Sequence, residues 1–294
     1  MIKLHRARAR ATRSAATLLI IGLATSVAGC HGTDHVQPRK MDSALTADFE
    51  QVGAARVYFG HQSVGGNILS GLAALQGQLD RPLIRVAELG ALDAGDGGGV
   101  LLQTAIGQNG KPNAKCEDFR QVMRQLQGRV DVALFKFCYI DFDDQSDAAA
   151  IFDTYSRTMD EMKRQYPEVT FVHVTAPLRS IERGPGVWAR ELLGKRNRAK
   201  HANAARGEFN RLLRERYAAD PIFDLAAVMS TYPDGRRETF TLDGRTYESL
   251  VPAYTNDGGH LNAVGATYGA AGFVESIATA LRSRSGSQGP QAGQ

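Results

Sequence analysis

Cysteine, tryptophan and long hydrophobic runs are all scarce in this chain of 294 residues, which has three cysteines and one tryptophan. Cys30, Cys116 and Cys138 are too few for a disulfide scaffold, and no Cys-x-x-Cys pair exists, so a structural zinc site is not expected. Cys116 and Cys138 could form one bridge or stay as two buried thiols. The sequence predicts no cofactor.

Acidic residues are absent from the first thirty positions, where a cationic segment precedes an apolar run, Ser14 to Gly29. The run has about 16 residues, fewer than the roughly 20 that a membrane-spanning helix needs, and the pattern is typical of a secretory leader. Its end, "VAGC", resembles a bacterial lipoprotein signal, which would leave Cys30 as an N-terminus carrying lipid such as palmitate. An ordinary signal peptide or a short membrane anchor remains an alternative.

Removal of this leader also changes the charge of the protein. The formal net charge is +4, but the leader contributes five basic residues and no acidic ones, so the mature chain is close to −1. That balance does not support a nucleic-acid partner. The expected location is the cell envelope, with the membrane contacted through the lipid. Because His31 replaces the Asp usual in retention signals, we expect the periplasmic face of the outer membrane.

The remaining chain suits one domain of about 260 residues or fewer. We expect a leader at 1–29, a polar tether at 30–43, a folded domain at 44–283 and a disordered tail at 284–294. The oligomeric state is not indicated.

Strand-like and helix-like segments alternate through the domain. We expect strands near 56–60, 83–89, 130–140, 169–178 and 221–225, and helices near 47–57, 65–79, 116–127, 149–166, 187–217 and 263–282. This order predicts an α/β fold with a parallel sheet covered on both faces. The Gly-rich stretch 90–115 is expected to be a loop, and Asp-Gly turns within 229–260 predict a small hairpin.

One serine stands where such a fold places ligands. In "YFGHQSVGGNI", Tyr58 to Ile68, a β-type run ends just before Ser63 and a helical pattern follows. Ligands of open α/β sheets sit beyond the carboxyl ends of the strands, so Ser63 is a candidate nucleophile. The alternative is that Ser63 only caps the following helix.

A carboxylate and an imidazole stand close together late in the chain. In "TNDGGHLNAVG", Asp257 and His260 are three positions apart, directly before the last helix. The carboxylate could orient the imidazole as the base for a hydroxyl nucleophile. The parallel topology would bring this loop to the same sheet edge as Ser63. Alternatively, Asp257 is a turn residue and His260 a buried structural histidine.

The combination of "FGHQSVG" with a late "DGGHLN" resembles the SGNH (GDSL-type) hydrolases, over roughly Arg56 to Ala280. The resemblance implies a flavodoxin-like three-layer α/β/α sandwich with five parallel strands, and ester hydrolysis without a metal. It also implies Ser63 as nucleophile, His260 as general base and Asp257 as its partner.

The oxyanion hole of that family is only partly matched. Ile140 stands where the family has an asparagine, and the glycine donor could be Gly95, Gly107 or Gly110. Asn109 could reach the site instead, with Lys111 or Lys115 adding positive charge. A missing donor costs about 10²–10³ in rate.

Three other residues have alternative roles. His61 could bind substrate, or could join Asp257 and His260 around a metal. Lys136 is expected to be structural. Cys138 lacks an indicated basic partner, so a thiol nucleophile is not expected.

These features predict a lipid-anchored serine esterase that acts on a small or carbohydrate-linked O-acyl ester. Two alternatives stay open: a non-catalytic carbohydrate-binding or assembly lipoprotein on the same fold, and an O-acyltransferase.

Overall fold

The computed structural model describes residues 36–90 and 98–287. Our predictions for the leader, for Cys30, for Gly95 and for the end of the tail lie outside these ranges. Within the described ranges, no helix combines the length and the apolar character needed to cross a membrane.

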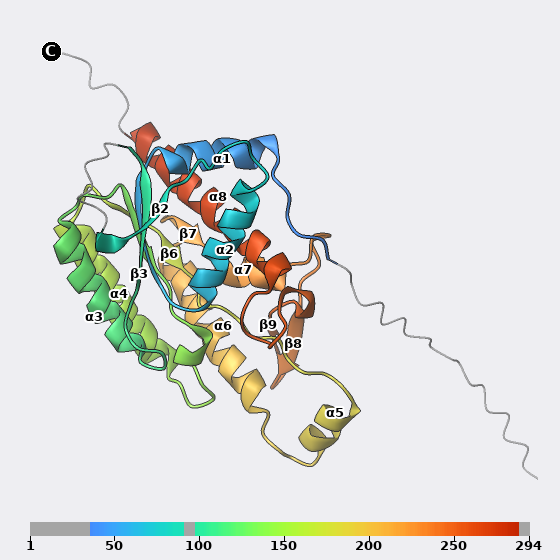
Figure 1. Ribbon diagram of the computed structural model, residues 1–294. Coiled ribbons are helices and arrows are strands. Elements are labelled where there is room, and N and C mark those ends of the chain that lie inside the picture. Colours follow the sequence, from blue (N-terminus) through green and yellow to red (C-terminus); the bar gives the residue numbers. More distant parts are fainter. Residues whose placement is uncertain (1–35, 91–97, 288–294) are drawn as a thin grey trace, which may run out of the picture. The chain divides into compact units, whose positions relative to one another are not determined.

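A parallel sheet of five strands runs through the centre of the described structure (Figure 1). Its strand order is β2-β3-β1-β4-β5, and every neighbouring pair is parallel. The strands are β2 (Val86–Glu88), β3 (Val100–Ala105), β1 (Arg56–His61), β4 (Val132–Phe135) and β5 (Thr170–Phe171). The predicted parallel α/β fold is therefore confirmed.

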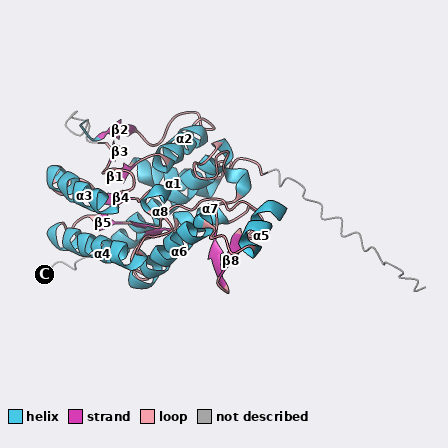
Figure 2. Ribbon diagram, turned by 90° about the horizontal axis from the view of Figure 1, so that it is seen from below, coloured by secondary structure: helices cyan, strands magenta, loops and turns pink. Residues whose placement is uncertain are grey.

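Helices cover both faces of this sheet (Figure 2). One layer contains α1 (Ser43–Gly53), α2 (Val64–Gln76), α7 (Leu225–Ser230) and α8 (Ala263–Ser287), and the other contains α3 (Pro112–Leu126), α4 (Ala148–Gln165) and α6 (Arg198–Arg216). Successive side chains of β1 alternate between the layers, since Val57 and Phe59 pack in the first core and Tyr58 in the second. This alternation follows from the two-residue period of a strand.

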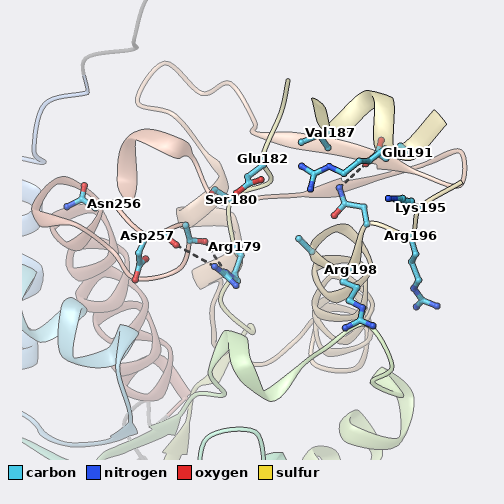
Figure 3. A pocket seen from close by; sticks show the side chains of 14 residues that line it. Arg179, Ser180, Glu182, Val187, Glu191, Lys195, Arg196, Arg198, Asn256 and Asp257 are labelled. Carbon is cyan, nitrogen blue, oxygen red and sulfur yellow. Dashed lines mark hydrogen bonds between the residues drawn. The ribbon is translucent and has the colours of Figure 1, made fainter. Parts of the chain in front are cut away.

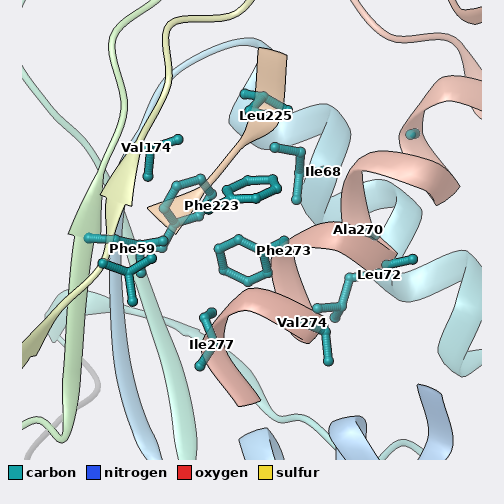
Figure 4. Close-up of a cluster of buried hydrophobic side chains, with 14 of the residues drawn as sticks. Phe59, Ile68, Leu72, Val174, Phe223, Leu225, Ala270, Phe273, Val274 and Ile277 are labelled. Atoms are coloured by element: carbon teal, nitrogen blue, oxygen red, sulfur yellow. The ribbon is translucent and has the colours of Figure 1, made fainter. Parts of the chain in front are cut away.

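Aromatic rings join the first layer to the sheet (Figure 4). The ring centroid of Phe273 in α8 lies 4.8 Å from that of Phe59 in β1 and 5.7 Å from that of Phe223. Phe223 belongs to β7 (Ile222–Phe223), which pairs in parallel with β6 (His173–Val174) rather than with the central sheet. The C-terminal helix is thereby fixed against the strands whose ends carry the site.

Strand β3 was not predicted from the sequence. It lies inside the Gly-rich stretch 90–115 that we expected to be a loop, and it pairs with β1 along its whole length. The segment "VLLQTA" is only six residues long and lies between glycine-rich stretches, so its pairing between two strands, rather than its own pattern, decides its conformation. The predicted strand at 83–89 is shorter in the structure, where only Val86–Glu88 forms the edge strand β2.

The predicted helix at 187–217 was also wrong in part. The structure has two helices, α5 (Pro185–Leu192) and α6, separated at Gly194, whose φ of +72° ends the helical run. The predicted hairpin is confirmed as β8 (Thr239–Leu242) and β9 (Arg245–Glu248), joined at Asp243 and Gly244. Single-turn 3-10 helices lie at Tyr139–Asp141 and Pro252–Tyr254.

The folded domain extends beyond the predicted bounds, 44 and 283, at both ends. Part of the predicted tether packs on the domain, because the Arg39 N–H donates to Thr267 Oγ1 (2.9 Å) and the Met41 N–H to Gln78 Oε1 (3.0 Å). The Asp42 carboxylate then caps α1 by accepting from the Leu45 N–H. At the other end, α8 continues to Ser287.

The contact between α2 and α8 supplies a stability test. A Cβ added at Gly71 in α2 would lie 2.0 Å from the Ala266 carbonyl oxygen of α8, whereas one added at Gly66 would meet nothing within 4 Å. We expect Gly71→Ala to lower the free energy of unfolding by about 1–3 kcal/mol, because backbone must move. Gly66→Ala should be neutral or slightly stabilising. Urea denaturation of both variants checks this, and equal midpoints would contradict the close approach.

Candidate active site

Ser63 lies at the carboxyl end of β1, directly before the first residue of α2. Its backbone adopts φ 31° and ψ −90°, and its hydroxyl makes no hydrogen bond to the helix end. The alternative that Ser63 caps the helix is therefore wrong. Positive φ is rare for a residue with a side chain and occurs mainly where the surrounding structure enforces it, often at functional sites. The side chain is exposed, so a ligand can reach the hydroxyl.

The surroundings of Ser63 leave a hydrogen-bond donor free. Within residues 36–90 and 98–287, the Ser63 backbone N–H donates to no protein acceptor. The neighbouring Gln62 points away, since its amide nitrogen donates to the carbonyl oxygens of Ile106 (2.7 Å) and Gly107 (2.6 Å). The hydroxyl oxygen lies 3.9 Å from Cys138 Sγ. An oxygen anion formed at Ser63 would therefore find one backbone donor available.

Asp257 and His260 form a hydrogen-bonded pair in the loop before α8. Asp257 Oδ2 lies 2.5 Å from His260 Nδ1, while Oδ1 accepts from the backbone N–H groups of Gly259 (2.9 Å) and His260 (2.8 Å). The side-chain hydrogen bond from His260, and then these backbone donors, hold the pKa of the Asp257 carboxyl well below its usual range. Because a carboxylate only accepts, Nδ1 is the donor in this contact, and a neutral ring then has its lone pair on Nε2. His260 is thus in the tautomer that a general base needs.

Two contacts bring the segments of Ser63 and His260 together. The Tyr139 hydroxyl lies 3.3 Å from Nε2 and 3.4 Å from Nδ1 of His260, and Tyr139 directly follows Cys138, whose Sγ lies 3.9 Å from the Ser63 hydroxyl oxygen. The backbone N–H of Leu261 donates to Asn67 Oδ1 (3.2 Å), one helical turn after Ser63. No hydrogen bond joins Ser63 to His260 among the described residues. Catalytic hydrogen bonds are often long before substrate binds.

The residues suggested for the oxyanion hole are engaged elsewhere. The Gly107 N–H donates to Asp118 Oδ2 (2.7 Å), Asn109 Oδ1 accepts from the Lys115 ammonium (3.2 Å), and Lys111 is exposed at the start of α3. Lys115 itself is fully buried and pairs with Asp141 at 2.5 Å. Ile140 is 55% exposed and offers no side-chain donor.

A buried amine and a thiol lie behind Ser63. Lys136 is 1% exposed, and its Nζ lies 3.7 Å from Cys138 Sγ and 3.1 Å from the Phe137 carbonyl oxygen. Burial lowers the pKa of Lys136. The expectation that Cys138 lacks a basic partner was wrong. Cys116 and Cys138 are both free and buried, so they do not form the bridge.

His61 is an interior residue. It is 7% exposed, its Nε2 lies 2.9 Å from Gln103 Oε1, and its Nδ1 has no partner in the described structure. Burial, and then the charge of Lys136, lower the pKa of His61 to about 4. The ring is therefore neutral at neutral pH.

The metal alternative finds no ligand cluster. Among the described residues, no three His, Cys, Asp or Glu side chains are grouped so that they could hold a metal ion. His61 is buried, whereas the side chains of His260 and Asp257 are 41% and 53% exposed.

Several residues that build this site were not identified from the sequence. Arg206 and Asn203 in α6 are both buried. Arg206 donates to the Tyr139 carbonyl oxygen (2.6 Å and 2.9 Å), and Asn203 exchanges two hydrogen bonds with the backbone of Arg179. The only sequence signal for Asn203 and Arg206 is their i, i+3 spacing, which places both on one side of a helix. No sequence signal identified Tyr139, whose role depends on the folded loop.

A polar cleft of about 890 Å³ opens beside Asp257 (Figure 3). Arg179 and Ser180 line it together with Asn256, Asp257 and Gly258, and α5 with the segment 195–199 forms its other side.

No protein-family model matches this sequence, and no curated protein sequence does. In three dimensions the chain is similar to an acetyl xylan esterase, AlAXEase, with 16% identity over 76% of this chain and 98% of the other (TM-score 0.41). It is also similar to the catalytic domain of a Streptococcus pneumoniae peptidoglycan O-acetyltransferase, with 15% identity over 80% and 96% of the two chains (TM-score 0.38).

A third likeness is to the periplasmic domain of a Salmonella Paratyphi A lipopolysaccharide acetyltransferase, with 12% identity over 82% of this chain and 90% of the other (TM-score 0.40). All three TM-scores are below 0.5, and we draw no conclusion about activity from these likenesses.

The buried His61 predicts a pH dependence of stability. Between its ordinary pKa of about 6.5 and the folded-state value of about 4, the unfolded chain binds more protons than the folded chain, so stability falls as pH falls. From about pH 7 to about pH 5, wild type should lose about 2 kcal/mol more than His61→Gln. Urea denaturation at both pH values measures the difference.

His173, whose pKa burial also lowers, is present in both proteins and cancels in this comparison. Parallel pH profiles for wild type and His61→Gln would contradict a neutral His61.

Proposed function

We propose that this protein is a serine esterase of the SGNH type, in which Ser63 is the nucleophile, His260 the general base and Asp257 the residue that orients His260. The observation that carries the proposal is the Asp257–His260 pair, at 2.5 Å, held beside the loop that also contacts the Ser63 hydroxyl. The positive φ of Ser63, with its uncapped and exposed hydroxyl, supports the same role.

The reaction that these groups support is acyl transfer through a covalent intermediate. Ser63 Oγ attacks the ester carbonyl and its proton passes to His260 Nε2. The tetrahedral intermediate then expels the alcohol, which takes that proton, and leaves an acyl group on Ser63. Water, deprotonated by His260, attacks the acyl group and releases the acid and the free serine. Asp257 stays ionised and stabilises the protonated imidazole.

The oxygen anion of the intermediate needs donors in place of the missing asparagine. The free backbone N–H of Ser63 supplies one. The Cys138 thiol, 3.9 Å from the Ser63 hydroxyl oxygen and 3.7 Å from Lys136 Nζ, is a further polar group beside Ser63. Such donors act most strongly where water is excluded.

The proposal places this esterase in the bacterial cell envelope, anchored through a lipid on Cys30. The leader pattern of the sequence supports the anchor, and O-acyl groups on envelope carbohydrates are the esters present at that location. The O-acyl carbohydrate is proposed as the substrate by analogy, from the expected location and from the fold.

The alternative of a non-catalytic binding lipoprotein keeps one observation in its favour. Ser63 and His260 are not hydrogen-bonded within the described ranges, as expected of a protein that does not catalyse acyl transfer. The esterase proposal requires that these two side chains come within hydrogen-bond distance when substrate binds.

Covalent labelling of Ser63 separates these functions. We expect a fluorophosphonate to attach to wild type and not to Ser63→Ala, and we expect p-nitrophenyl acetate hydrolysis to fall by roughly 10³-fold or more. Intact-protein mass spectrometry and initial rates measure the two effects. Ser70→Ala, which removes an exposed hydroxyl from the same helix, is the matched control and should keep both properties. A wild-type protein with neither adduct nor turnover would favour the binding function.

Removal of the Asp257 charge tests the orienting role. Asp257→Asn should lower kcat by roughly 10⁴-fold, because an amide can stabilise the wrong tautomer of His260. A folded variant with unchanged kcat would remove Asp257 from the mechanism. Circular dichroism confirms folding.

A further inference from the structure

We propose that the cleft beside Asp257 binds an anionic group, a carboxylate or a phosphate, on the carbohydrate that carries the ester. This inference rests on the proposed function and names the class of substrate.

The cleft has a local excess of positive charge, although the chain after the predicted leader has a formal net charge close to zero. Its lining contains five basic and three acidic side chains. Two of the acidic ones are already paired: Asp257 with His260, and Glu191 with Lys200, a residue outside the lining, at 2.9 Å. Glu182 is the remaining acid. The cleft therefore has an excess of cations that its own carboxylates do not neutralise.

Three of these cations are available to a ligand. Among the described residues, Arg179, Arg190 and Lys195 form no ion pair with any carboxylate, whereas Arg196 and Arg198 share Asp144. The Arg190 guanidinium donates only to the carbonyl oxygen of Gly186 (3.2 Å). A guanidinium presents a planar fork of donors that fits a carboxylate or phosphate with two parallel hydrogen bonds.

Arg179 connects the cleft to the catalytic loop. Its Nε and Nη2 lie 3.3 Å and 3.4 Å from the carbonyl oxygens of Gly258 and Asp257, and its guanidinium stacks over the Tyr139 ring at 5.3 Å. Figure 3 shows Arg179 and Asp257 facing each other at one end of the cleft. An anion held at Arg179 would place the rest of its molecule beside the His260 loop.

The cleft also has the size and the polarity for a sugar. A volume of about 890 Å³ lies within the roughly 300–1,000 Å³ of small-molecule sites. Ser180 and Asn256 add neutral hydrogen-bonding groups at the end near Asp257. Binding energy from a group remote from the ester can be used to position the reacting carbonyl. Acylated acidic carbohydrates are therefore expected to be better substrates than neutral ones.

An anionic membrane is the competing ligand. Trp188, Leu192 and Leu193 are exposed on and just after α5, at 65%, 71% and 76%. The basic side chains, however, line a hollow rather than a flat surface, which favours a single group that enters it.

Binding is measured with the full-length chain carrying Ser63→Ala, so that no turnover occurs. The probes are trigalacturonate (carboxylates), glucose 1-phosphate (phosphate) and cellotriose (neutral), titrated by calorimetry at about 20 mM and about 300 mM NaCl. We expect one or both anionic probes to bind, cellotriose not to bind, and high salt to weaken binding. The anionic probe that binds identifies the source of the charge.

Replacement of the two cations outside the catalytic loop tests the cleft itself. Arg190→Ala/Lys195→Ala, added to Ser63→Ala, should weaken binding of the anionic probe by about tenfold or more, since two charge-assisted contacts are lost. Arg81→Ala/Arg85→Ala removes two exposed arginines outside the cleft and is the matched control, which should bind as the parent does.

Three outcomes would overturn the proposal: no binding of either anion, equal binding of cellotriose, or equal loss in the two double variants. Binding only to phosphatidylglycerol vesicles would also overturn it and assign the surface to the membrane. Phosphonate labelling of wild type reports the esterase function independently. Labelling of Ser63 without anion binding would therefore contradict only the proposal for the cleft. Anion binding without labelling would contradict only the proposed esterase function.

Discussion

The position of β1 at the centre of a parallel sheet is the constraint on which the site depends. Both neighbours of β1 run in its direction, so the ends of β3, β1 and β4 reach one edge together. Ser63 follows β1, and Cys138 and Tyr139 follow β4. A one-residue change in pairing would turn every side chain of β1 to the other core. The close packing of Val57, Tyr58 and the following residues in two separate cores therefore also positions Ser63, the proposed nucleophile.

Buried charges hold the loops that surround this edge. Asp141 accepts from the Lys115 ammonium (2.5 Å) and from the backbone N–H groups of Cys138 (2.6 Å) and Gly110 (2.8 Å). A buried carboxylate is tolerated only when its lone pairs are satisfied in this way. The Arg206 guanidinium donates to the carbonyl oxygens of Tyr139 and Phe142 and so holds the same loop through its acceptor groups. The loop that contacts both Ser63 and His260 is thus fixed from two sides by buried polar groups.

Local sequence pattern predicted the elements whose signals are strong and failed where burial decides. The helix at 149–166, the closing helix and the Asp243-Gly244 hairpin were predicted, because their periodicity or turn residues are unambiguous. Strand β3 was missed because a six-residue apolar segment among glycines has no distinctive period. The break was missed although Gly194 and Asn197 are residue types that end and begin helices, because the basic and apolar residues on either side continue the helical pattern.

The sequence by itself determined the alternation of strands and helices, the place of Ser63 between the first strand and a helix, and the proximity of Asp257 to His260, since these depend on residues within a few positions of one another. Tertiary structure decided the rest. It placed a buried amine beside Cys138, engaged Gly107 and Asn109 with other partners, and set Arg179 between the loop of Asp257 and His260 and a basic cleft. The physical reason is that burial and long-range contact, which fix charge and hydrogen bonding, join residues far apart in the chain.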